Sequence, residues 1–201
     1  QEKGIYIGVS SVIIKRDILN NPLFKYYFLG HRWRIPPGNA EEKELIKSLR
    51  NDIVKIALVS RDNNLLQEHG FYSNNDINNL LSTINNCIPV DMCCNNIYPD
   101  IENKPFINHS VVFPALQFAL YCGFSKIYLV GCDCVGFSNP TTVHFTNNNN
   151  ITDAYKNDKE HHLIDWWKKI YSFKKLYYTN TAIININPIG LKGLMDKDIY
   201  V

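Results

Sequence analysis

The chain alternates short apolar runs with longer amphipathic segments, an order that predicts strands separated by helices. Apolar runs without period-two alternation indicate strands buried on both faces. Such runs cover residues 5–9, 26–29, 53–59 and 126–131, and two short ones cover 175–178 and 183–186. Helix-length segments lie at 40–49, 76–84, 111–122 and 153–172. This order predicts an α/β fold, a Rossmann-like open and mostly parallel sheet with helices on both faces.

The segment 110–133 carries the clearest boundaries. Ser110 precedes an apolar stretch of helix length and Gly123 follows it, and these are favoured residues at the two ends of a helix. The run Ile127–Val130 then predicts a central strand with almost no exposed side chain.

Length and composition narrow the classes of protein. A chain of 201 residues with an ordinary apolar share fits a single domain over 1–201. The net charge of +2 gives no broad electrostatic case for nucleic acid or for an anionic membrane. No apolar stretch reaches about 18 residues and no signal peptide is visible, so we expect a cytoplasmic protein. The six cysteines form no C-x-x-C pair, which favours reduced thiols and no zinc.

Small or polar side chains stand at the carboxyl ends of the predicted strands. In open parallel sheets ligands bind beyond these ends, so the set predicts a binding crevice, although strands commonly end in polar residues without function. Ser110 is a further candidate, because its hydroxyl and the helix amides can hold an anion, or it is a plain helix cap. The candidate binding residues are Ser10, His31, Ser110, Asp133 and Asn185.

The stretch SVVFPALQFALYCGFSKIYLVGCD, residues 110–133, resembles the 6-hydroxymethylpterin pyrophosphokinase-like domain family. That family is similar in turn to bacterial lipooligosaccharide sialyltransferases. Its pattern is Ser or Thr opening a helix, then Gly, Phe or Tyr, any residue, Lys or Glu and Ile-Tyr-Leu, followed by Gly-x-Asp. The weaker matches are His144-Phe145 after that Asp and the closing turn 184–190.

Two departures from the family pattern stand at the front of the chain. Ser10 occupies a strand end where the family has Asn, and the Gly-rich phosphate loop that opens the family is absent. We therefore expect a fragment that lacks the first strand and phosphate-binding loop of its family.

The resemblance implies a glycosyltransferase of bacterial surface polysaccharide or lipooligosaccharide synthesis, which binds a nucleotide sugar and a glycan acceptor. Peripheral membrane association would then come through the acceptor. His144, in the long polar loop 136–151, is the candidate general base, because a His near its usual pKa can deprotonate an acceptor hydroxyl. An ordinary loop His, and Tyr155 as the base, are open alternatives. No metal is expected; a pterin pyrophosphokinase would need Mg²⁺, and a non-catalytic module is the third alternative.

Overall fold

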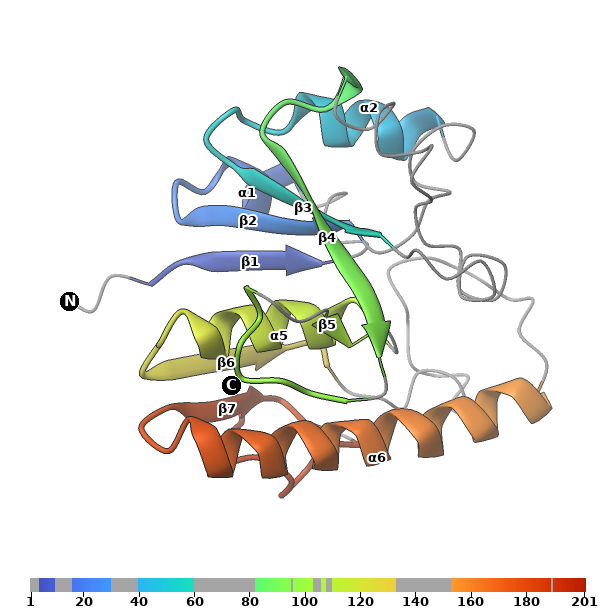
Figure 1. The fold of residues 1–201 in the computed structure, drawn as a ribbon, viewed down its shortest axis with the longest axis vertical. Coiled ribbons are helices and arrows are strands. Elements are labelled where there is room, and N and C mark those ends of the chain that lie inside the picture. Colours follow the sequence, from blue (N-terminus) through green and yellow to red (C-terminus); the bar gives the residue numbers. More distant parts are fainter. Residues whose placement is uncertain are drawn as a thin grey trace. The chain divides into compact units, whose positions relative to one another are not determined.

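The computed structural model describes residues 4–9, 16–29, 40–59, 82–94, 96–102, 106–107, 110–132, 153–188 and 190–201 (Figure 1). The chain divides into two compact units, Gln1–Ala115 and Leu116–Val201. Each unit is built on its own parallel sheet, and each is described by itself below. The single domain expected from the length stays a prediction.

The first unit contains a five-stranded sheet in which every described pairing is parallel. Its order, β1-β2-β3-β4-β5, follows the order of the strands along the chain. Two described helices, α1 (Arg16–Asn20) and α2 (Ala40–Ser48), connect successive strands. The strands are β1 (Tyr6–Val9), β2 (Phe24–Leu29), β3 (Val54–Val59), β4 (Cys87–Cys94) and β5 (Phe106–Ile107).

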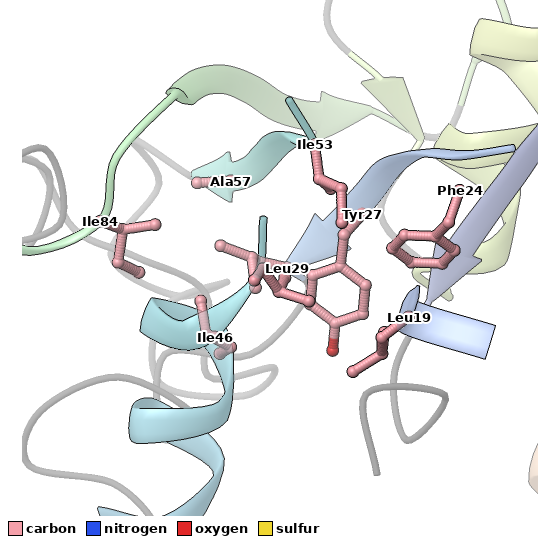
Figure 2. Packing of buried hydrophobic residues seen from close by; sticks show 9 residues of the cluster. Leu19, Phe24, Tyr27, Leu29, Ile46, Ile53, Ala57 and Ile84 are labelled. Carbon is pink, nitrogen blue, oxygen red and sulfur yellow. The ribbon is translucent and has the colours of Figure 1, made fainter. Parts of the chain in front are cut away.

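The core of this unit forms where α1 and α2 pack on one face of β2 and β3. Figure 2 shows Leu19 of α1 and Ile46 of α2 with Tyr27 and Leu29 of β2. The other face of these strands is also buried, at Phe28 of β2 and at Ile56 and Leu58 of β3. Strands covered on both faces explain why these runs are apolar without alternation.

Arg50, two residues after α2, forms hydrogen bonds with the end of α1, the loop after it and the start of β2. Its guanidinium donates to the carbonyls of Leu19 (2.7 Å), Asn21 (2.9 Å) and Phe24 (3.1 Å). The remaining donors reach the carboxylate of Asp52, at 2.9 and 3.4 Å. An arginine offers five N–H donors, and here all of them are used. The pocket lined by Leu19, Leu45, Leu49 and Arg50 therefore has no guanidinium donor left for an anion.

The second unit contains a three-stranded parallel sheet in the order β6-β7-β8. Its strands are β6 (Lys126–Val130), β7 (Ala182–Ile186) and β8 (Lys197–Ile199). The helix α5 (Val112–Tyr121) spans the boundary between the units and leads to β6, and α6 (Asp153–Tyr177) leads to β7. The buried side of α6 repeats at helical spacing, with Trp166, Trp167, Ile170 and Phe173.

The predicted α/β fold with parallel sheets is confirmed, and so are the predicted strands at β1, β2, β3, β6 and β7. The helix end at Gly123 is confirmed as well. Gly123 has φ of +75°, the left-handed conformation that closes a helix at low cost for glycine, and its N–H donates to the Leu120 carbonyl at 3.0 Å.

Two predictions were wrong in the second unit. β6 pairs with β7 alone among the described strands, and Tyr128 and Val130 are 54% and 75% exposed. An apolar run does not by itself distinguish a middle strand from an edge strand, and β7 is the middle strand here. The predicted strand at 175–178 is the last turn of α6, because the helix continues to Tyr177.

Three strands were not predicted. β4 contains Pro89, and a proline disfavours the prediction of a strand because it has no N–H to donate. Since β5 pairs only near Met92 and Cys94, Pro89 lies in a stretch of β4 with one neighbouring strand, where a missing N–H is tolerated. β5 and β8, of two and three residues, are too short to show any period. The predicted helix 76–84 falls mostly outside the described residues.

Candidate functional site

Asn185 is the sequence-predicted site residue whose surroundings the structure describes most fully. It is the fourth of the five residues of β7, one position before the carboxyl end of the middle strand. The residue is 0% exposed, and neither its Oδ1 nor its Nδ2 has a hydrogen-bond partner among the residues that the structure describes. Leaving a buried polar group unpaired costs about 1 to 3 kcal/mol. Such a cost marks a position where a polar partner would bind favourably.

Asp198 stands next to Asn185 on the neighbouring strand. The two residues are Cα partners in the β7–β8 pairing, and partners in one row of a sheet carry their side chains on the same face. The Oδ2 atom of Asp198 accepts a hydrogen bond from the Gly193 amide at 2.7 Å. Its Oδ1 atom is buried and has no hydrogen-bond partner within the described part of the chain. This fixed carboxylate therefore keeps one free acceptor on the face that carries Asn185.

The two side chains together offer a donor and two kinds of acceptor. The Asn185 amide nitrogen donates, while its oxygen and the Asp198 Oδ1 accept. Hydroxyl groups can both donate and accept, so a polyhydroxylated group or ordered water satisfies such a set. Leu129 is the Cα partner of Asn185 on β6, so a buried apolar side chain lies next to Asn185 on the same face of the sheet.

A second carboxylate holds the turn that delivers Asp198 to the sheet. Asp196 accepts from Lys174 Nζ at 2.9 and 2.8 Å, from the Tyr171 hydroxyl at 2.8 Å and from the Ile183 amide at 2.7 Å. Burial alone would raise the pKa of Asp196, but the hydrogen bonds from Lys174, Ile183 and Tyr171 outweigh burial and lower it. Burial and the same carboxylate raise the pKa of Tyr171 to about 12.

Backbone contacts close the carboxyl end of β7. Asn187 has φ of +50°, a conformation that Asn tolerates better than most residues. Its amide donates to the Ile199 carbonyl at 2.8 Å, and its Oδ1 accepts from the Val201 amide at 2.9 Å. The strand ends of β7 and β8 are thereby tied together just beyond Asn185 and Asp198.

Ser110 lies in the first unit, two positions before α5, and is half-buried. Its carbonyl accepts a hydrogen bond from the Phe113 amide at 3.1 Å, which starts the helix where the sequence predicted it. Asn185 lies in the second unit, so the crevice predicted to contain both residues stays a prediction.

The other predicted site residues, Ser10, His31, Asp133 and His144, lie outside the described residues. Tyr155 belongs to α6, but its side chain also lies outside them. Asp198 was missed by sequence reasoning. The sequence feature that could have indicated Asp198 is a carboxylate at the start of the short apolar C-terminal segment 198–201, which follows the turn at 190–196.

Three observations bear on cofactors and location. Within the part of the chain that the structure describes, no three His, Cys, Asp or Glu side chains are grouped as metal ligands would be. Cys87, Cys122 and Cys132 are reduced cysteines, and Cys122 is exposed. No described helix is long and apolar enough to cross a membrane.

Fold and site together define an α/β protein with parallel sheets and a buried polar pair, Asn185 and Asp198, on neighbouring strands. Comparison of the chain with protein-family models, with curated proteins and with solved structures finds no match.

Proposed function

We propose that this protein binds a nucleotide-linked sugar and transfers the sugar to a glycan acceptor, with Asn185 among the residues that contact the donor. One observation carries the proposal: the carboxamide of Asn185 is wholly buried near the carboxyl end of a middle parallel strand and has no hydrogen-bond partner among the described residues. Ligands of open parallel sheets bind at that end. The sugar and ribose of a nucleotide sugar carry hydroxyl groups. These groups can donate hydrogen bonds to the Asn185 carboxamide oxygen and to the Asp198 carboxylate.

The resemblance over residues 110–133 supports the same class of substrate and supplies the candidate general base, His144. Ser10, His31, Ser110 and Asp133, the other residues that the sequence predicts to bind the donor, stay predictions. The reaction has no need of a metal. The acceptor is a cell-surface glycan built on the cytoplasmic side of a membrane.

Binding is tested by isothermal titration of the protein with CMP-, UDP- and GDP-sugars. The Asn185→Leu variant should weaken the binding of the preferred donor at least tenfold, since one lost hydrogen-bonding group costs about 1.4 kcal/mol or more. The same variant should raise Tm by about 2 to 4 °C, because an apolar side chain of similar size replaces buried unpaired polar atoms.

The matched control is Asn180→Ala, which removes an exposed carboxamide in the turn before β7 and should change neither quantity. Failure of every nucleotide sugar to bind contradicts the proposed function. Unchanged affinity in Asn185→Leu, with a donor that binds the wild type, removes Asn185 from the site. For turnover, His144→Ala should lower kcat by roughly 10²- to 10⁴-fold and leave donor affinity unchanged.

A further inference from the structure

The second half of α6 exposes a stripe that is both basic and apolar. Lys168, Lys169, Lys175 and Leu176 are exposed, and the second pair follows the first by seven residues, about two helical turns, which places all four on one side of the helix. The residues that fill the opposite side are the buried Trp166, Trp167, Ile170 and Phe173. We call the exposed side, Lys168 to Leu176, the lysine stripe.

The positive charges of the lysine stripe are held in place. The Lys169 ammonium lies over the Trp166 ring, 4.2 Å from its centroid, and Lys175 lies over Tyr171 at 4.4 Å. Such cation–π contacts leave the outer side of each ammonium open to solvent. Asp165, which pairs with Lys168 at 3.1 Å, is the one acidic residue along this side among the described side chains. The stripe therefore presents a net positive surface.

The stripe ends in apolar surface. Leu176 is 74% exposed and Tyr177 is 58% exposed at the last turn of α6. The Tyr177 ring packs against Phe173 with centroids 5.0 Å apart, so Tyr177 lies on the side of the helix that carries Phe173, and Leu176 is the apolar residue of the stripe. An exposed leucine beside lysines adds nothing to phosphate recognition in a nucleic acid, whereas it gains free energy at a lipid interface.

We propose that the lysine stripe docks on an anionic lipid surface, with its ammonium groups at the phosphates and Leu176 at the boundary of the acyl chains. Lysines near such a surface are attracted by charge, and a leucine side chain buries apolar area at its boundary. The inference stands on the contacts of α6 and does not rest on the proposed transferase activity.

The test is co-sedimentation of the full chain with phosphatidylcholine vesicles, with and without phosphatidylglycerol. Binding is expected only to the anionic vesicles and should weaken with added salt. Replacing Lys168, Lys169 and Lys175 together by Gln should weaken binding about 100-fold, from roughly fivefold per lysine. Leu176→Ser should weaken it about tenfold, because the exposed leucine no longer buries its side chain.

A matched variant removes three exposed lysines elsewhere: Lys47→Gln, Lys192→Gln and Lys197→Gln. It has the same net charge as the stripe variant and should bind like the wild type. An equal loss in both triple variants would show that net charge alone drives binding and would overturn the proposal. Equal binding to neutral vesicles, or no binding to either kind, would also overturn it. Full binding by Leu176→Ser together with tight binding to single-stranded RNA would assign the stripe to nucleic acid instead. Circular dichroism establishes that each variant is folded.

Discussion

Asp196→Asn should destabilise the protein more than any other single removal of charge described above. The substitution leaves Lys174, whose side chain is 6% exposed, without its counter-ion. Breaking a buried ion pair by removing one partner costs about 3 to 5 kcal/mol. The Asp196 side chain is 26% exposed and an amide still accepts from Tyr171 or Ile183, so we expect the lower end, about 3 kcal/mol. That loss is a large share of the usual 5 to 15 kcal/mol of a folded domain.

Urea unfolding at pH 7, followed by circular dichroism, measures this loss. Asp165→Asn is the control, since Asp165 forms a comparable contact with Lys168 but is 66% exposed. Its effect should stay below about 0.5 kcal/mol, as for most surface pairs. A second variant, Lys174→Met with Asp196→Asn, should recover part of the loss, because no unpaired charge is left buried. Equal effects of Asp196→Asn and Asp165→Asn would refute the reasoning.

The pH dependence provides an independent readout of the same pair. The pKa of Asp196 is lowered in the folded state, so the carboxylate contributes stability above its unfolded pKa of about 4. That contribution is lost as the pH falls through the folded pKa. The difference in unfolding free energy between wild type and Asp196→Asn should therefore be full at pH 7 and shrink on acidification below about pH 4. A difference that stays constant into acid would contradict the lowered pKa.

Two further predictions concern the backbone. Arg50→Met should lower the unfolding free energy, measured in urea, by about 2 to 3 kcal/mol, because three backbone carbonyls lose their donor. The control Lys47→Met, on the exposed face of α2, should change the unfolding free energy by less than about 0.5 kcal/mol. Gly123→Ala should cost about 1 kcal/mol in thermal unfolding from the left-handed backbone alone, since a Cβ there meets no atom within 4 Å. Gly4→Ala, which has the same open space without positive φ, should be neutral, and equal Tm changes in the two would disprove the backbone explanation.

The sequence predicts most where local chemistry marks both ends of an element. Ser110 and Gly123 bracket α5, and the apolar runs of β1, β2 and β3 are long enough to recognise. Prediction fails where the outcome depends on neighbours distant in the chain. Nothing near Val130 indicates that β6 pairs on one side, because that depends on which strand lies beside it.

The candidate site shows the same limit. Asn185 is predicted from its place at the end of an apolar run, which is a local property. That its amide is buried without a partner, and that Asp198 stands beside it, depends on the pairing of β7 with a three-residue strand. Register between strands is set by packing across the sheet, so a single sequence does not reveal it.

The order β1-β2-β3-β4-β5 has a consequence for the protein during its synthesis. Each strand that leaves the ribosome finds its partner in the strand made just before it, and none waits for a later segment to be inserted between two earlier ones. The first sheet can therefore assemble vectorially, as domains that form from the N-terminus do. At every stage the newest strand presents an unpaired edge, which is the feature that pairs with other chains in aggregation. Nascent chains paused after β3 would carry that open edge until β4 emerges to cover it.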